Sequence, residues 1–265
     1  MGRPILGLRS TLKSLTRRDI KSYMSRRYSA ESVFITATGN VNHTKLVRAL
    51  SDSIGKIKRS GKAQVIKAPV ATRSVKLVKR DLEQVHLCMG VPVPSMTDRK
   101  RFELYLINTM LGSGMSSKLF QEVREKRGLA YSVYSYLNLC KDAGSLVVYA
   151  GTSKESFGEV LTVVLNEFEK LATELTIEQL NHTKDQLKGG IVLALETTDA
   201  RMMKIAKDEI YFGKSMPIKS LIKEIDRVKL EDVRKSIENY LSPDNITLAA
   251  IGGGMKKRDL PSVLK

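Results

Sequence analysis

The sequence predicts an α+β fold, in which an antiparallel sheet is covered by helices on one face. Strand-like and helical patterns alternate between residues 73 and 152, helical patterns fill most of residues 157–242, and a last strand-like run follows at Asn245–Gly252. The order is therefore two strands, two helices, two strands, a series of helices and one strand. This order favours an antiparallel sheet with the helices packed together on one side.

The first third of the chain predicts two helices and a strand, followed by a linker. Thr16 is a suitable N-cap for a helix that begins at about Arg17. The β-rich run Val33–Gly39 comes next, and apolar residues between positions 46 and 54 then recur with helical spacing. Residues 58–72 mix Lys, Gly, Ser, Ala and Pro without a helical period, which is typical of an interdomain linker. We therefore expect residues 1–57 and 73–265 to belong to different domains.

The second part begins with two expected strands, Ser74–Arg80 and Gln84–Val91. In the second of these, apolar residues occupy every other position, as a half-buried strand requires. The elements expected next are a helix over Thr97–Leu111, a Gly/Ser loop over Gly112–Ser116, a short helix over Ser117–Lys126 closed by Gly128, a strand pair over Tyr131–Asn138 and Gly144–Gly151, a long helix around Phe157–Leu171, and four more helical stretches within residues 176–242.

Basic residues are concentrated in the first third of the chain. Residues 1–80 hold 19 of the 45 Lys and Arg residues but 3 of the 28 Asp and Glu residues, so most of the net charge of +17 lies there. This asymmetry indicates either an anionic partner or a surface that meets acidic residues elsewhere. No nucleic-acid-binding motif and no long apolar window accompany it, which disfavours nucleic acid and a transmembrane segment. The two cysteines, Cys88 and Cys140, exclude a disulfide framework and a CxxC zinc site.

The chain also contains an internal repeat. Residues 14–39 align without gaps on the segment that starts at Arg227, at an offset of 213 residues. The matched pairs are Asp19/Asp232, Ser29/Ser242, Gly39/Gly252 and the apolar pairs Ile20/Val233, Met24/Ile237, Val33/Ile246 and Ile35/Leu248. A fixed offset predicts a duplicated unit of about 210 residues. We expect the chain to hold the end of a first copy and an essentially complete second copy.

Three stretches carry a family resemblance. The most specific is LGSGMSSKLFQEVREKRGLAYSVYSY at Leu111–Tyr136; the others are GRPILG at Gly2–Gly7, with the helix and YSAESVFITATGNVNHTKLV after it, and the closing SPDNITLAAIGG. Together they resemble the pitrilysin/insulinase (inverzincin) metallopeptidases, particularly the short bacterial members and mitochondrial processing peptidase. The resemblance implies a duplicated two-domain metallopeptidase architecture. In it, residues 1–57 would be the tail of the first, catalytic-type domain and residues 73–265 the second, inactive domain.

The same resemblance implies a catalytic zinc in the first domain, on an H-x-x-E-H helix with a further glutamate downstream. Such a site needs two histidines on one helical face and a carboxylate beside the metal-bound water. This sequence has no H-x-x-E-H motif, and His43, His86 and His182 fall on three different expected elements. We therefore expect no zinc site and no peptidase activity in this chain alone, and zinc in the missing catalytic half.

Arg124 and Tyr131 are the candidate site residues. They lie in VREKRGLAY, and the resemblance implies that this pair reaches across to the active site, for substrate binding and transition-state support. A guanidinium binds a substrate carbonyl or carboxylate, and a phenol donates to a developing oxyanion. The spacing alone equally fits a charge on a solvated helix and a surface aromatic on a strand. The Gly112–Ser117 loop has two interpretations, a border of the peptide chamber or a plain connection, and for Tyr134 and Tyr136 we expect core packing.

The leading hypothesis is the substrate-binding, non-zinc half of a zinc metalloendopeptidase, acting on a peptide or protein together with a catalytic half or a homo- or hetero-dimer partner. The alternatives are a non-catalytic scaffold or partner subunit of a peptidase complex, and an anion-binding module that uses the basic first third. An H-x-x-E-H motif encoded upstream of Met1 would favour the first, and nucleic-acid binding with a steep salt dependence the last. The sequence does not determine the compartment, and the cytoplasm is favoured.

Overall fold

The computed structural model describes residues 4–57 and 67–265 of the chain. The chain divides into two compact units, a smaller one made of Met1–Pro69 with Leu195–Ser215 and a larger one made of Val70–Ala194 with Met216–Lys265. Residues 58–66 of the expected linker lie outside the described residues, so the domain boundary there stays a prediction.

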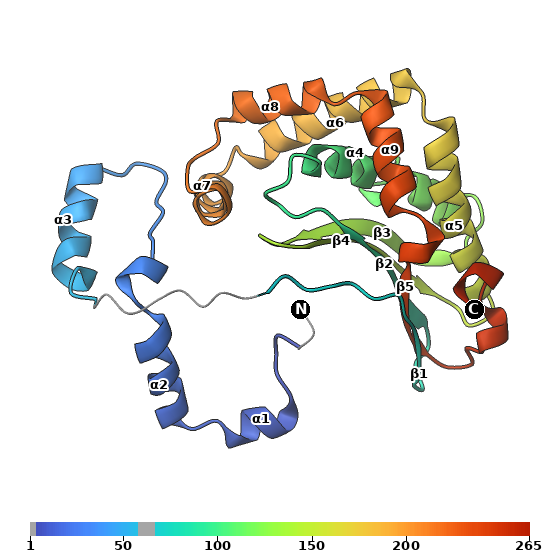
Figure 1. Cartoon of the computed structure of the whole chain (residues 1–265), viewed down its shortest axis with the longest axis horizontal. Coiled ribbons are helices and arrows are strands. Elements are labelled where there is room, and N and C mark those ends of the chain that lie inside the picture. The colour runs from blue at the N-terminus through green and yellow to red at the C-terminus, as the bar shows by residue number, and fades with distance from the viewer. Residues whose placement is uncertain (1–3, 58–66) are drawn as a thin grey trace. The chain divides into compact units, whose positions relative to one another are not determined.

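A five-stranded sheet organises the described part of the larger unit (Figure 1). Its strands are β1 (Val75–Lys79), β2 (Val85–Val93), β3 (Ala130–Leu139), β4 (Gly144–Thr152) and β5 (Thr247–Gly252), in the order β1-β5-β2-β4-β3. Neighbouring strands are antiparallel except β1 and β5, which are parallel. β1 and β3 therefore form the two edges of the sheet.

Helices lie on one side of this sheet (Figure 1). They are α4 (Arg101–Gly112), α5 (Phe157–Glu174), α6 (Ile177–Ala194), α8 (Ile218–Arg227) and α9 (Leu230–Tyr240). β2 shows how the sequence produces this layering: Val85, Leu87 and Met89 are buried in the core, whereas the alternate residues His86 and Cys88 are only half-buried. The predicted α+β fold, with helices packed on one face of the sheet, is confirmed.

The described elements of the smaller unit are the α-helices α1 (Arg9–Ser14), α2 (Arg17–Arg27), α3 (His43–Ile54) and α7 (Thr198–Phe212) and a 3₁₀ turn at Ala30–Ser32. α2 begins where the sequence predicts it, because the Asp19 backbone N–H donates to Thr16 Oγ1 at 3.3 Å. α7 contacts this unit through Thr38, whose hydroxyl donates to the carbonyl of Thr198 at 2.6 Å. Residues 195–215 therefore group with the first third of the chain, although the sequence predicts a second domain that includes them.

The strand expected at Val33–Gly39 is absent from the described residues, so this prediction was wrong. The backbone is extended at Val33, with φ −117° and ψ 127°, but no described strand pairs with this run. A strand is held by hydrogen bonds to a neighbour and by burial of one face. Here Val33 and Ile35 remain 40% and 48% exposed, because the run has the alternating apolar residues of a strand but no described strand beside it.

The internal repeat is visible in the helices. The bounds of α2 and α9 differ by the same 213 residues, and each helix uses an aspartate at its third position as a cap. Asp19 Oδ2 accepts from the Thr16 N–H at 2.9 Å, and Asp232 Oδ2 accepts from the Lys229 N–H at 3.1 Å. A short 3₁₀ turn follows each helix at the same offset. The copies diverge at the next strand, because β5 pairs with β1 and β2.

Candidate functional site

The polypeptide around Arg124 and Tyr131 turns sharply from a helix into the edge strand β3. Phe120–Glu125 form a π-helical turn, and Gly128 follows it with a φ of +61°, a left-handed conformation that glycine adopts readily. The Gly128 N–H donates to the carbonyl of Arg124 at 3.1 Å, and the Leu129 N–H donates to that of Val123 at 2.9 Å. These bonds satisfy the last carbonyls of the helix and direct the chain into β3.

Tyr131 lies at an irregularity in the edge strand. Ala130 is opposite Thr152 and Ser132 is opposite Gly151, so Tyr131 is an extra residue without a partner across the ladder. The Thr152 hydroxyl donates to the carbonyl of Leu129 at 2.5 Å, which fixes the start of the strand. Tyr131 is 77% exposed, so the bulge directs its side chain toward solvent.

The structure brings Arg124 and Tyr131 into direct contact. The guanidinium carbon of Arg124 lies 4.7 Å from the centre of the Tyr131 ring and 4.8 Å from the centre of the Phe120 ring. A guanidinium over aromatic faces is attracted by their π-electrons and keeps its N–H groups at its own edge. Arg124 Nε also lies 3.7 Å from Glu125 Oε1, and the side chain is 36% exposed. The pair therefore offers a preorganised set of donors to a carbonyl or carboxylate.

The neighbouring cations are engaged elsewhere. Lys126 Nζ lies 2.5 Å from Glu122 Oε1, and Arg127 lies 3.4 Å from Glu122 Oε2. The hydrogen bond from Lys126 lowers the pKa of the Glu122 carboxyl below its ordinary value. Arg124 thus differs from the other charges of this turn in being held by rings. Its contact with substrate stays a prediction.

The Gly/Ser loop that precedes this turn is ordered by its own hydrogen bonds. Ser117 Oγ donates to the carbonyl of Gly114 at 2.6 Å, and Gln121 Nε2 donates to that of Met115 at 2.8 Å. A Cβ atom at Gly112 would lie 2.3 Å from the backbone nitrogen of Ser135, so only glycine allows α4 to end this close to β3. Met115 is 75% exposed at the tip of the loop.

An aromatic cluster that the sequence did not predict lies on the sheet face opposite the helices. Tyr134 and Tyr136 are 44% and 41% exposed rather than packed in the core, so that expectation was wrong. The Tyr134 ring lies 5.0 Å from that of Tyr149, whose hydroxyl is 2.8 Å from His86 Nδ1. Burial raises the pKa of Tyr136 and Tyr149. The alternation of side chains in β2 and β3 predicts which residues share the exposed face. The contact between the rings depends on the strand register, which places Tyr134 opposite Tyr149.

The described residues do not fit a zinc site. His43 begins α3, His86 lies in β2 and His182 lies in α6, as expected from the sequence. Among the residues described, no group of three or more His, Cys, Asp or Glu side chains is arranged to hold a metal ion. Cys88 and Cys140 are free thiols, and burial raises the pKa of Cys88. Nor is any helix within residues 4–57 and 67–265 both long and apolar enough to cross a membrane.

Comparison with known proteins identifies the family. Residues 14–187 match the family model described as the peptidase M16 inactive domain. The chain belongs to the peptidase M16 family. The resemblance seen in the sequence is thereby confirmed, and the matching model is that of the inactive domain.

M16 relatives span more than this chain. An uncharacterized zinc protease of Mycobacterium bovis is 36% identical over 275 residues, which cover 100% of this chain and 62% of that protein. One from Bacillus subtilis is 32% identical over 252 residues, covering 95% of this chain and 61% of that protein. The chain thus spans somewhat over three fifths of these relatives.

Solved structures show the same fold at lower identity. A peptidase M16 inactive domain from Pseudomonas fluorescens superposes with a TM-score of 0.83 at 21% identity, covering 96% of this chain and 61% of that one. A chain of Complex III2 from Candida albicans superposes with a TM-score of 0.85 at 20% identity, covering 94% and 62%.

Proposed function

We propose that this M16 chain is the substrate-binding, non-zinc half of a zinc endopeptidase, and that it works by pairing with a catalytic half of the same fold. Its match to the inactive domain and the poor fit of its described residues to zinc support the assignment to the non-zinc side. The names of its longer relatives, zinc proteases, support the chemistry of the whole. On this proposal, zinc and the general base belong to the partner half.

The observation that carries the proposal is a set of apolar side chains without cover. Ile20, Met24, Val33 and Ile35 in the first copy of the repeat are 52%, 43%, 40% and 48% exposed, whereas their counterparts Val233, Ile237, Ile246 and Leu248 in the second copy are at most 1% exposed. In the larger unit α9 packs against α4, α5 and β2, and β5 lies between β1 and β2. Apolar patches of this kind mark interaction surfaces. By analogy with the second copy, an equivalent sheet and helix layer would cover α2 and residues 33–39 in the paired enzyme.

The repeat also suggests a role for each part of the chain. Residues 1–57 would complete the fold of the catalytic half, residues 58–72 would link the halves, and residues 73–265 would form the second domain. The catalytic half would be either a further part of the same polypeptide or a separate chain that pairs with this one as a heterodimer, because a second copy of this chain brings no H-x-x-E-H motif.

In the paired enzyme, Arg124 and Tyr131 would contact the substrate from the non-zinc side. The Arg124 guanidinium would hold a peptide carbonyl or carboxylate in the ground state, because the N–H donors of this planar group form a fork that matches such oxygens. The Tyr131 phenol would donate to the oxygen on which negative charge develops. The bulge that exposes Tyr131 and the ring contact that orients Arg124 support this division of roles.

Reconstitution tests the proposal. The purified chain is mixed with a polypeptide from the same genome that carries H-x-x-E-H, and cleavage of a fluorogenic peptide is measured. We expect activity only in the mixture. Tyr131→Phe should lower kcat about 100-fold with little change in KM, because the hydrogen bond forms mainly in the transition state. Arg124→Ala should also raise KM about tenfold, because a charged ground-state hydrogen bond is lost.

Two control variants test whether the kinetic effects are specific to Arg124 and Tyr131. Arg127→Ala removes a guanidinium from the same turn, but one that faces Glu122, and should leave kinetics unchanged. Tyr240→Phe removes a phenol hydroxyl at the end of α9 and should do the same. Association without cleavage would assign the chain to the non-catalytic partner subunits instead, and near-normal kinetics of Tyr131→Phe would remove that residue from the site.

A further inference from the structure

An open groove of about 1270 Å³ runs between β1 and the segment that follows β5. Its apolar lining comes from Val75 and Leu77 of β1 and from Met255, Leu260 and Leu264 of the C-terminal segment. Met255, Leu260 and Leu264 are buried, but Val75 is 36% exposed and Leu77 is half-buried, so apolar surface of the strand is open to the groove. The volume exceeds the roughly 300–1,000 Å³ of ordinary small-molecule sites. A polypeptide segment fits it better than a metabolite does.

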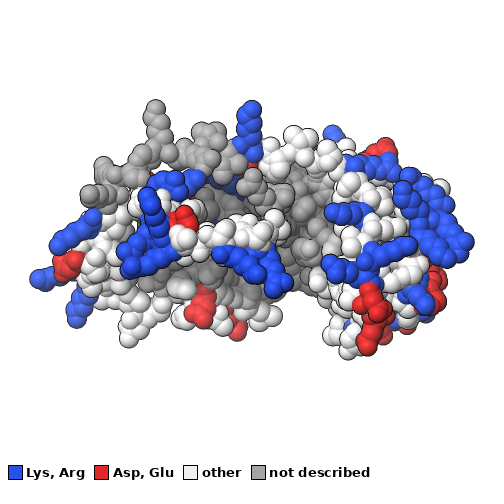
Figure 2. Space-filling model, turned by 90° about the horizontal axis from the view of Figure 1, so that it is seen from below, with Lys and Arg blue, Asp and Glu red and all other residues white. Residues whose placement is uncertain are grey.

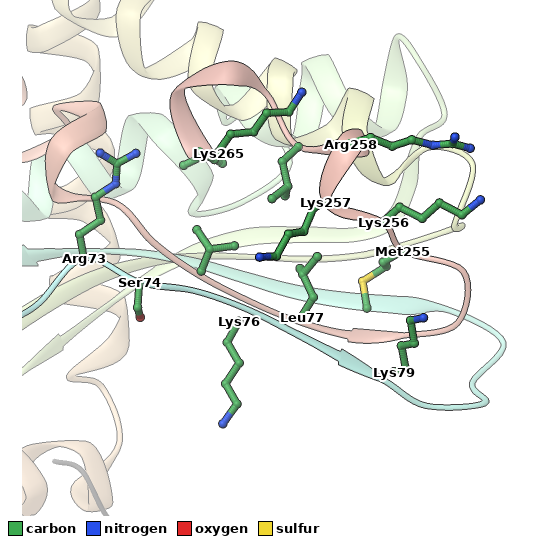
Figure 3. Close-up of a pocket in the computed structure, with 13 residues that line it drawn as sticks. Arg73, Ser74, Lys76, Leu77, Lys79, Met255, Lys256, Lys257, Arg258 and Lys265 are labelled. Atoms are coloured by element: carbon green, nitrogen blue, oxygen red, sulfur yellow. The ribbon is translucent and has the colours of Figure 1, made fainter.

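Basic side chains surround this groove (Figure 3). Arg73 and Lys265 lie at one end, Lys79, Lys256 and Arg258 lie at the other, and Lys257 lies between them. No acidic residue is among the described residues that line it. Two of these cations form long ion pairs: Arg73 Nη1 lies 3.6 Å from Asp244 Oδ1, and Arg258 Nε lies 3.8 Å from Asp259 Oδ1. Arg73 Nη2 also donates to the carbonyl of Val263. Figure 2 shows where Lys and Arg side chains, in blue, lie on one face of the described residues. The groove therefore favours an acidic occupant.

Among the described residues, the strand beside the groove has a free edge. β1 pairs with β5, and no described strand pairs with its other side. Ser74 O accepts from the Leu248 N–H at 2.9 Å, and the Arg80 N–H donates to Gly252 O at 3.1 Å. In a parallel ladder such bonds come from every second residue. The backbone groups of Val75, Leu77 and Lys79 therefore point away from β5, where an added strand would find donors and acceptors.

From these observations we propose that the groove binds an acidic, extended segment of a partner polypeptide, which adds as a strand to the free edge of β1. The edge supplies backbone hydrogen bonds, Val75 and Leu77 receive apolar side chains, and the basic ends receive carboxylates. Arg73 and Lys79 are six positions apart, about 20 Å along a strand. The recognised segment is therefore about seven residues long, with acidic residues at both ends and β-branched residues between them. A single-stranded nucleic acid fits less well, since such sites stack bases on aromatic side chains and no described lining residue is aromatic.

Fluorescence anisotropy of a labelled synthetic peptide on the full chain tests this proposal without a catalytic half. The probe has two acidic residues at each end and Val-Thr-Val in the middle, and its control has Gln and Asn in place of the acids. We expect the acidic probe to bind at least tenfold more tightly at low salt, and the difference to shrink as salt rises. Proline in place of the central threonine should weaken binding at least fivefold, because it removes a ladder donor.

Charge-removing variants locate the binding surface. Lys79→Gln and Lys257→Gln remove cations from the strand side and the opposite side of the groove, and each should weaken binding about two- to fivefold. Lys141→Gln removes the same charge from the β3–β4 turn at the other edge of the sheet, and should have no effect. Equal binding of the acidic and neutral peptides, or equal effects of all three variants, would overturn the proposal. So would an oligothymidylate that binds more tightly than the peptide and loses affinity with the same groove variants, since the groove would then be a nucleic-acid surface.

Discussion

Truncating Ile35 and Leu248 to alanine should have very different effects on stability, although the repeat places the two residues at the same position of one pattern. Leu248 lies in β5, between β1 and β2, and is 0% exposed. Ile35 is 48% exposed in a run that no described strand pairs with. The two side chains are isomers, so the chemical change is nearly the same in each. The comparison therefore isolates the effect of the covering layer.

The magnitude follows from burial. Leu248→Ala removes fully buried carbon atoms and leaves a cavity, which costs about 2–5 kcal/mol of unfolding free energy. Ile35→Ala removes a half-exposed side chain and should change that free energy by no more than about 0.5 kcal/mol. With a urea slope of about 2 kcal/mol per molar, the first substitution lowers the unfolding midpoint by at least about 1 M. The second leaves the midpoint almost unchanged.

Urea unfolding followed by far-UV circular dichroism measures both variants. The affinity for the catalytic half should show the opposite order. Ile35→Ala should weaken this affinity about tenfold, as the loss of a buried interface residue does. Leu248→Ala should leave the affinity unchanged at urea concentrations below the unfolding transition. Equal destabilisation by the two substitutions would refute the reasoning, because Ile35 would then already be covered in the free chain.

Three further outcomes are expected. Gly112→Ala should destabilise the chain by about 1–3 kcal/mol, because its Cβ would meet the Ser135 backbone, whereas Gly189→Ala in α6 has open space and should be neutral or stabilising in the same urea assay. Burial raises the pKa of Glu103 more than the hydrogen bond from Ser236 lowers it. The folded chain therefore binds this proton more tightly than the unfolded chain does, and the free energy of unfolding falls as pH rises above the ordinary Glu range. Glu103→Gln should therefore gain stability relative to the native chain between pH 4 and pH 7, and a constant difference would count against this cause. Dialysed chain should retain no stoichiometric zinc by metal analysis, and a chelator should leave its unfolding temperature unchanged; one zinc per chain would contradict this.

Local signals in the sequence were sufficient for most of the larger unit. The alternation in β2 and the apolar stripe of α5 each carry a period that matches one secondary structure. Failures occur where a distant partner decides the outcome. Residues 33–39 have the pattern of β5 but no described neighbouring strand. The start of α4 differs from the prediction for a local reason: it begins at Arg101 rather than Thr97, because turns precede it, with Asp98 Oδ1 accepting from the Lys100 N–H at 2.8 Å.

The sequence likewise predicts only part of the candidate site. That Arg124 precedes and Tyr131 follows a tight turn could be predicted from the sequence, because Gly128 between them marks the end of the helix. Their ring contact depends on Phe120 and on the bulge at Tyr131, which arises from the pairing of β3 with β4. The tyrosine cluster and the basic groove could not be found in this way. Both join segments far apart in the chain, and the groove combines residues 73–79 with residues 255–265.

The strand order places the groove and the Arg124–Tyr131 pair at opposite edges of one sheet. Four strand spacings separate β1 from β3, about 19 Å, which an extended polypeptide crosses in about six residues. A short fluorogenic peptide therefore cannot engage both surfaces, whereas a protein substrate with an acidic segment about ten or more residues from the scissile bond can. In the paired enzyme, Lys257→Gln should raise KM for such a long substrate about two- to fivefold and leave the short peptide unaffected. An equal effect on both substrates would mean that Lys257 acts on the active site itself, and no effect on either would restrict the groove to partners that are not cleaved.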